Sequence, residues 1–234
     1  MRFNAQMPSP LGNMLLSSNG SHLTGAYFIG QSDCPSLAGA TLSARQHGGP
    51  SDGLMAGLPI KNFKVRRVDQ ADLFASVMPL EVRYDISALE PGRSPGETLE
   101  PSRQVSSLTM HPDTPDRVQA LFEQVQQELN DYFAGRRQSF TVALHIEGSE
   151  FQKRVWQALR EIPYGESATY GDVARAAGLT PQHGRPVGTA VGRNPISIII
   201  PCHRVLGAGS ILTGYTGGLE RKLLLLQREG FTLG

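Results

Sequence analysis

The segment "SIIIPCHRVLG", residues 197–207, places a cysteine directly before a histidine. Cysteine reacts as the thiolate, and a free pKa of about 8.5 leaves only a small fraction ionised at neutral pH. Cys202 therefore needs a nearby base, cation or helix N-terminus to act as a nucleophile, and His203 and Arg204 follow it. If the apolar run is a strand that ends at Cys202, successive side chains point to opposite faces. A direct Cys–His contact is then awkward, whereas a turn after Pro201 or a bridging water removes the difficulty.

The same residues also have plainer interpretations. Buried cysteines are usually inert small hydrophobes, and a histidine beside one is often only a structural hydrogen-bond partner. Any carboxylate that orients His203 must come from elsewhere in the chain, and Glu229 is a candidate. From these residues alone, a nucleophile and an unreactive core thiol both remain open.

The composition limits which cellular compartments and which classes of binding partner suit the chain. The chain has 234 residues and a formal net charge of +1, so it is not a polycation. Residues 146–234 carry ten Lys/Arg against seven Asp/Glu, and residues 1–145 carry twelve against fourteen, so the second half is compatible with phosphate contacts without requiring them. Cys34 and Cys202 form no disulfide framework, which indicates a reducing compartment. Without a signal-peptide pattern or a membrane-length apolar run, we expect a cytoplasmic protein that makes no membrane contact.

The second half of the chain predicts the elements that would position the cysteine. Ser149 can cap a helix over 150–162, in which Trp156 looks buried. A short helix over 170–177 stops at Gly178, and another follows over roughly 182–193, which suggests a helix-turn-helix. A strand over 196–200 and a final helix over 218–230 complete the pattern.

The first half has a different texture. Short alternating runs in residues 1–30 predict an antiparallel meander. Residues 34–115 are rich in glycine, proline and serine, and we treat them as an insertion that is partly disordered, although residues 61–86 favour strands. A helix follows that Asp113 or Thr114 can cap and that Gly135 closes, and then a strand over 140–146.

The stretch "RNPISIIIPCHRVLG", followed by "GYTGGLERKLLLLQREG", resembles the alkylguanine-DNA alkyltransferases, also called methylated-DNA–protein-cysteine methyltransferases. The PCHRV pentapeptide is the signature of that family, and the match covers residues 147–230 almost continuously. The resemblance implies an α/β (α+β) fold in two domains. Residues 1–145 form a ribonuclease-H-like sheet domain that carries the insertion, and residues 146–234 form a mainly helical, winged-helix-like domain with the helix-turn-helix.

The resemblance also implies a single-turnover enzyme of DNA repair. Cys202 takes the alkyl group from the 6-oxygen of guanine and keeps it as S-alkylcysteine, and O4-alkylthymine is a second candidate substrate. His203 acts on the thiol through a water and is oriented by Glu229. The Tyr170 hydroxyl stabilises the leaving guanine, and Asn194 hydrogen-bonds the turn that presents the cysteine.

The implied partner is double-stranded DNA that contains alkylated guanine. It is bound through the minor groove with the damaged base rotated out of the stack, and Arg185 fills the vacancy. Further DNA contacts implied by the resemblance are Thr169, Gly188 and Arg193, and further pocket residues are Val205, Tyr215, Thr216 and Gly217. We expect a monomer without a cofactor. We also expect no metal, because the spacing of Cys34, His22, His47 and His111 matches no zinc pattern.

Two other functions compete with this interpretation. The protein could be a non-enzymatic sensor that binds alkylated DNA and recruits repair partners, or a thiol hydrolase that uses Cys202 and His203. Stoichiometry separates the three. A transferase accepts about one alkyl group per molecule, a hydrolase turns over many times, and a sensor accepts none.

Overall fold

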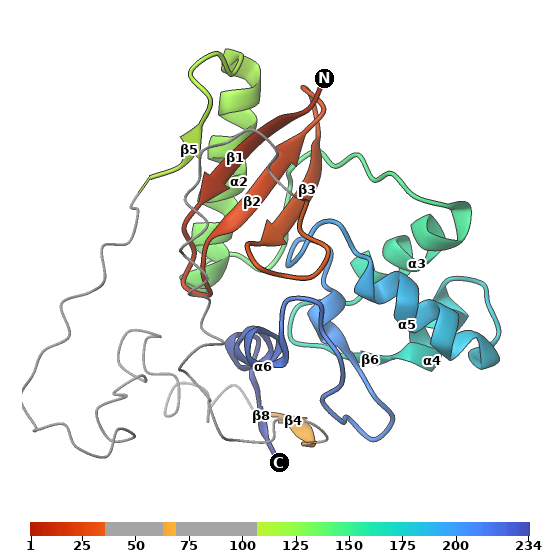
Figure 1. Cartoon of the computed structure of the whole chain (residues 1–234). Coiled ribbons are helices and arrows are strands. Elements are labelled where there is room, and N and C mark those ends of the chain that lie inside the picture. Colours follow the sequence, from red (N-terminus) through yellow and green to blue (C-terminus); the bar gives the residue numbers. More distant parts are fainter. Residues whose placement is uncertain (36–62, 69–106) are drawn as a thin grey trace, which may run out of the picture.

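The computed structural model describes residues 1–35, 63–68 and 107–234. The first half of the chain builds an antiparallel sheet of order β3-β2-β1-β5, and α2 packs behind it (Figure 1). The strands are β1 (Phe3–Met7), β2 (Met14–Ser18), β3 (Leu23–Phe28) and β5 (Thr109–Met110). The meander predicted for residues 1–30 is therefore confirmed.

Helix α2 (Asp116–Phe133) covers the sheet with the apolar stripe that its sequence predicts. The prediction for its N-cap is wrong, because Pro115 occupies the cap position without a side-chain hydrogen bond. The hydroxyl of Thr114 donates instead to the carbonyl oxygen of His111 at 2.7 Å. The buried residues of the stripe are Val118, Leu121, Phe122, Val125, Leu129, Tyr132 and Phe133.

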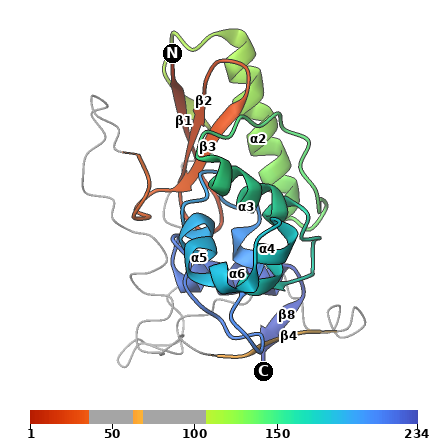
Figure 2. The ribbon, with the colours of Figure 1, turned by 90° about the vertical axis from the view of Figure 1, so that its right-hand side faces the viewer.

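Three helices gather on one side of the second half, as both ribbon views show (Figures 1 and 2). Helix α3 (Glu150–Arg160) begins with the predicted Ser149 cap, which forms a reciprocal capping box with Gln152. Trp156 of α3 is buried and donates its indole N–H to the carbonyl oxygen of Ala190 at 2.8 Å. This contact joins α3 to the helix that carries Arg185.

The predicted pair of short helices is present with one shifted boundary. Helix α4 (Tyr170–Ala176) is followed by the 3₁₀ turn η3 (Pro181–His183) and then by α5 (Gly184–Gly192). Helix α5 therefore starts two residues later than the expected position 182. Pro186 lies in its first turn, where the missing N–H has no intrahelical partner to lose.

Two predicted strands are wrong. Ile196 forms only an isolated bridge to Ala26, and residues 197–200 are turn and bend. Residues 140–146 likewise make only the bridge between Leu144 and Leu23. The edge of β3 is shared between these two segments, so neither of them has a full partner strand. An apolar run signals burial in either case, because such a run does not by itself distinguish a strand from a buried turn.

The remaining elements join distant parts of the chain. Strand β6 (Ala168–Thr169) pairs in parallel with β7 (Val205–Leu206), and α6 (Leu219–Arg228) leads to β8 (Phe231–Leu233). Strand β4 (Val65–Arg67) pairs antiparallel with β8. Strands β4 and β5 fall inside the expected insertion 34–115. Residues 36–62 and 69–106 of that insertion, which include most of 61–86, lie outside the described residues. Within the described ranges, no helix combines the length and the apolar character needed to cross a bilayer.

Candidate active site

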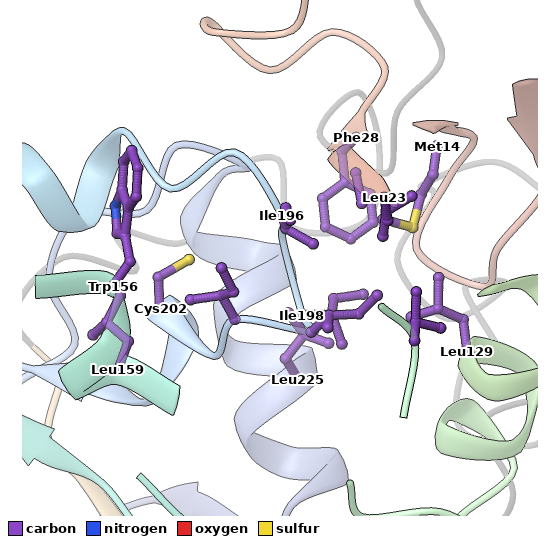
Figure 3. Close-up of a cluster of buried hydrophobic side chains, with 14 of the residues drawn as sticks. Met14, Leu23, Phe28, Leu129, Trp156, Leu159, Ile196, Ile198, Cys202 and Leu225 are labelled. Carbon is purple, nitrogen blue, oxygen red and sulfur yellow. The ribbon is translucent and has the colours of Figure 1, made fainter. Parts of the chain in front are cut away.

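Cys202 starts a single 3₁₀ turn, η4 (Cys202–Arg204), and does not end a strand as the sequence suggested. The turn before it is tight and strained, because Ile198 has a φ of 72°. A positive φ is a rare conformation for a β-branched residue, so the surrounding packing must hold it in place. Figure 3 shows Cys202 among the buried side chains of the core, between Trp156 on one side and Ile196 and Ile198 on the other.

The side chain of Asn194 fixes this turn and also reaches the sulfur. Its amide nitrogen lies 2.8 Å from the carbonyl oxygen of Ile200 and 3.0 Å from Sγ of Cys202. Its amide oxygen accepts the backbone N–H of Ile196 at 3.1 Å. Asn194 is 3% exposed, so these contacts are shielded from competing water. The amide thus holds the backbone of the turn and donates a hydrogen bond to the thiol at the same time.

The thiol of Cys202 is protonated at neutral pH in the resting protein. Burial raises the pKa of Cys202 to about 11, although the hydrogen bond from Asn194 and the positive charge of Lys222 act to lower it. A thiol with this pKa is a poor nucleophile until its proton is removed. The site therefore needs a base that acts when a substrate is present.

His203 has the properties of such a base. It is fully buried, and its Nε2 lies 2.9 Å from Oε1 of Glu229. An ionised carboxylate only accepts hydrogen bonds, so Nε2 carries the proton and Nδ1 carries the lone pair. Within the described part of the chain, Nδ1 is buried and has no hydrogen-bond partner. Burial also lowers the pKa of His203, so the imidazole is neutral and able to accept a proton.

Glu229 is the centre of a buried polar network that the sequence revealed only in part. Tyr132 donates to its Oε1 at 2.8 Å, and Arg204 donates through Nε to Oε2 at 2.8 Å and through Nη2 to Oε1 at 3.0 Å. The backbone N–H of Gly165 adds a contact at 3.3 Å. Burial by itself would raise the pKa of Glu229, but His203 and Arg204 outweigh it and lower the pKa to about 2. Tyr132 and Arg204 were not expected here. The only sequence feature that pointed to either residue was the position of Arg204 within the PCHRV motif.

A pocket of about 320 Å³ opens onto Cys202. Several residues that the sequence analysis placed in the site or on the DNA side line it together: Tyr170, Gly188, Cys202, Tyr215 and Thr216. Val191, Gly192 and Gly214 also line it, and so does Ser32 from the first half of the chain. The hydroxyl of Tyr170 lies 3.3 Å from that of Thr213, and Thr216 donates to the carbonyl oxygen of Gly192 at 2.6 Å. A concave site with a few convergent polar groups suits a small planar ligand.

Some expected residues lie outside this pocket. Val205 is fully buried, and its carbonyl oxygen accepts a hydrogen bond from Lys222. The carbonyl oxygen of Gly217 accepts from Arg221 at 2.8 Å, so each of these two carbonyls already has one donor within the protein. Thr169 caps α4 through the backbone N–H of Asp172. Arg185 and Arg193 are exposed at the start and the end of α5.

Lys222 of α6 is a further buried charge that the sequence analysis missed. Its side chain is fully buried, and besides Val205 its ammonium donates to the carbonyl oxygens of Thr213 at 2.8 Å and Gly214 at 3.4 Å. Burial lowers the pKa of Lys222 to about 8. The ammonium therefore connects the segment that follows Cys202 to the loop that forms one wall of the pocket, and it places a positive charge near the thiol.

Comparison with known proteins identifies the family. Residues 150–231 match the family described as "6-O-methylguanine DNA methyltransferase, DNA binding domain". A methylated-DNA–protein-cysteine methyltransferase of Methanosarcina acetivorans is 52% identical over 119 residues, which cover 51% of this chain and 76% of that protein. The chain belongs to the methylated-DNA–protein-cysteine methyltransferase family. A second member, from Mycobacterium bovis, is 46% identical over 151 residues, covering 64% of this chain and 86% of the relative.

Solved structures of the methyltransferase family share the mixed α/β fold. The O6-methylguanine methyltransferase of Mycobacterium tuberculosis aligns with a TM-score of 0.57 and 30% identity, over 98% of this chain and 93% of that one. The M. tuberculosis OGT in complex with DNA aligns with a TM-score of 0.56 and 31% identity, over 96% of this chain and 91% of that one. No group of three or more His, Cys, Asp or Glu residues that could hold a metal ion occurs in residues 1–35, 63–68 and 107–234.

Proposed function

We propose that this methyltransferase repairs DNA by moving the alkyl group of O6-alkylguanine onto Sγ of Cys202 in a single irreversible turnover. The observation that carries the proposal is the position of Cys202, which faces a pocket on one side and contacts Asn194, with the buried pair of His203 and Glu229 beside it. The sulfur lone pair forms the new carbon–sulfur bond, and the bond from carbon to O6 breaks. The thioether is stable, so the protein is used up.

The thiol proton must leave during the attack, because the pKa of about 11 keeps Cys202 protonated at rest. We assign its acceptance to Nδ1 of His203 through a water, which lets adjacent residues cooperate without direct contact. Glu229 orients the imidazole and stabilises the positive charge that develops on it. Arg204 and Tyr132 hold Glu229 in position, so they are positioning residues and not catalytic ones.

The electron pair of the broken bond passes to the purine, and the pocket must stabilise that charge. We assign this role to the hydroxyl of Tyr170, which already lies on the pocket wall near Thr213. A donor aimed at developing negative charge lowers the barrier more than it stabilises the bound substrate. Thr216 and Tyr215 line the same pocket and would orient the base. The proposed transfer requires no cofactor.

A base inside a duplex cannot reach a buried thiol, so we propose that the damaged nucleotide is rotated out through the minor groove. Helix α5 suits this approach, since Arg185 is exposed at its start and Gly188 lies at the pocket. We also assign DNA contacts to Thr169, the N-cap of α4, and to Arg193, which ends α5. Replacement of Arg185 by Ala should slow transfer from duplex DNA more than transfer from free O6-methylguanine. Equal slowing with both substrates would contradict the assignment.

We also propose a division of the fold into a ribonuclease-H-like sheet domain, residues 1–145, and a winged-helix-like domain, residues 146–234. The support is the sheet with α2 in the first half, and α3, α4 and α5 with the β6–β7 pair in the second. The pairing of β4 with β8 crosses this boundary. A short piece of the first half therefore packs on the second.

The test of the reaction is intact mass measured after incubation with duplex DNA that contains O6-methylguanine. We expect a gain of one methylene per molecule, located by peptide mapping at Cys202 and rising to one equivalent and no further. Removal of more than one methyl group from the DNA per protein molecule would indicate a hydrolase. DNA binding without any mass shift would indicate a sensor.

A further inference from the structure

The loop after β3, residues 29–35 and here called the Gln31 loop, brings the first half of the chain to the pocket. Ser32 of this loop lines the pocket, whereas every other lining residue lies in residues 170–216. Ser32 is exposed, so it stands at the mouth of the pocket and not in its floor. One wall of the pocket is therefore built by a different part of the chain from the part that holds the thiol.

The Gln31 loop has a buried polar anchor. The side chain of Gln31 is 6% exposed, and its Oε1 accepts the backbone N–H of Phe28 at 2.8 Å. Its Nε2 donates to Oδ1 of Asp33 at 2.7 Å. The backbone carbonyl oxygen of Gln31 accepts the backbone N–H of Cys34 at 3.1 Å. The oxygen and the nitrogen of the Gln31 side-chain amide thus both have hydrogen-bond partners in or next to the loop. Ser32 lies between Gln31 and Asp33, which this network joins.

The base of the loop is also fixed to the half of the chain that carries Cys202. The guanidinium of Arg221 lies 4.7 Å from the centre of the Phe28 ring, a cation–π contact. The same guanidinium donates to the carbonyl oxygens of Leu11 and Gly217, each at 2.8 Å. Two residues earlier, Ala26 exchanges backbone hydrogen bonds with Pro195 and Ser197 at 2.9 and 2.8 Å, just before the turn that presents the thiol. These contacts hold the base of the loop against the segment that leads to the thiol.

We infer that Ser32 is a specificity-determining residue that sets the size of the alkyl group the pocket accepts, an inference that rests on the proposed function. Serine has one of the smallest side chains. A wall that carries a small residue leaves space in the pocket that opens onto Cys202 for groups larger than methyl. A larger side chain at this position would occupy that space, and the anchored loop could not move away to restore it. The penalty would fall on bulky alkyl groups and spare methyl.

The test compares transfer rates from duplexes that contain O6-methylguanine or O6-benzylguanine, followed by intact mass. We expect the wild-type protein to accept both groups. The variants Ser32→Ala, Ser32→Val and Ser32→Phe place side chains of increasing size at this point of the pocket lining. The ratio of benzyl to methyl rates should fall with side-chain size, by about tenfold or more for Ser32→Phe, which is the range in which pockets discriminate by bulk.

A matched control is Ser21→Phe, since Ser21 is an exposed serine in the turn before β3 and does not line the pocket. It should leave the benzyl to methyl ratio unchanged. Methyl transfer reports on folding and on the proposed function in the same sample. An unchanged ratio across the Ser32 series, an equal slowing of both substrates, or a wild-type protein that transfers methyl but not benzyl would each overturn the inference. Loss of methyl transfer in the wild type would instead refute the proposed function.

Discussion

Cys34 and Cys202 are both free thiols, and they occupy different surroundings. Cys34 is partly buried at the end of the Gln31 loop, where its sulfur lies 3.8 Å from the carbonyl oxygen of Pro35. Burial and the charge of Asp33 raise the pKa of Cys34. Cys202 is buried too, and its pKa is raised to about 11. Neither thiol is acidic at rest, so acidity does not distinguish them.

The difference lies in the groups that can take the proton and hold the sulfur. Cys202 has the amide of Asn194 on its sulfur, a neutral buried imidazole next in the chain and the positive charge of Lys222 nearby. The sulfur of Cys34 lies against the carbonyl oxygen of Pro35 and near the negative charge of Asp33. Under the proposed function, the comparison means that Cys202 reacts because a base acts during the reaction, and not because its resting pKa is low.

The comparison is tested most severely by removing each sulfur in turn. We expect Cys202→Ala to abolish alkyl transfer completely while DNA binding survives, because the proposed acceptor sulfur is removed. Cys34→Ala should transfer one methyl per molecule at the wild-type rate. The measurement is intact mass with O6-methylguanine duplex, and binding is followed by fluorescence anisotropy. Transfer by the Cys202→Ala variant would show that the wrong cysteine has been assigned.

Glu229→Gln should slow transfer by about a hundredfold or more, the usual contribution of general base catalysis. The amide keeps the shape of the side chain but cannot stabilise a positive imidazole. Glu220→Gln, a change in the first turn of the same helix, is the matched control and should leave the rate unchanged. The measurement is the single-turnover rate at saturating DNA. A rate within threefold of wild type would argue that His203 does not act as a base.

Acid should destabilise the region around Cys202 through Glu229. The pKa of Glu229 is lowered from 4.5 to about 2 in the folded protein, so its ionised form favours folding at neutral pH. This contribution is complete above pH 4.5 and is lost as the pH falls toward 2, amounting to roughly 3 kcal/mol. Thermal melting between pH 6 and pH 3 should therefore show a smaller loss of stability in Glu229→Gln than in wild type. Parallel curves would contradict the pKa shift.

The smallest expected effect concerns the positive charge near Cys202. Lys222→Met removes a charge that lowers the thiol pKa and a contact that joins two pocket segments. We expect transfer to slow by about tenfold, equivalent to about one pKa unit of the thiol. Because the pKa of Lys222 is about 8, the wild-type advantage should shrink as the pH rises above that value. Lys153→Met on the exposed face of α3 is the control, and rates measured from pH 6.5 to 9.5 decide the outcome.

The local elements followed from local signals. The capping box at Ser149, the stripe of α2 and the two short helices α4 and α5 each depend on residues a few positions apart. Apart from the N-cap of α2, the wrong predictions concerned strands, whose partners are distant in the chain. Residues 196–200 looked like a strand because an apolar run signals burial without saying whether a neighbouring strand exists. The edge of β3 offers Ile196 only a single bridge, and the chain turns there through the strained Ile198.

The sequence by itself determined which groups are available for chemistry. Three features are visible in the order of residues along the chain: the adjacency of Cys202 and His203, the family signature around them, and Glu229 near the C-terminus. Tertiary structure alone decided what surrounds those groups. Tyr132, Lys222 and Ser32 reach the site from α2, α6 and the Gln31 loop, and Glu229 gains its low pKa only when His203 and Arg204 are packed against it. Burial and proximity are set by packing between residues far apart in the chain, and no local pattern records them.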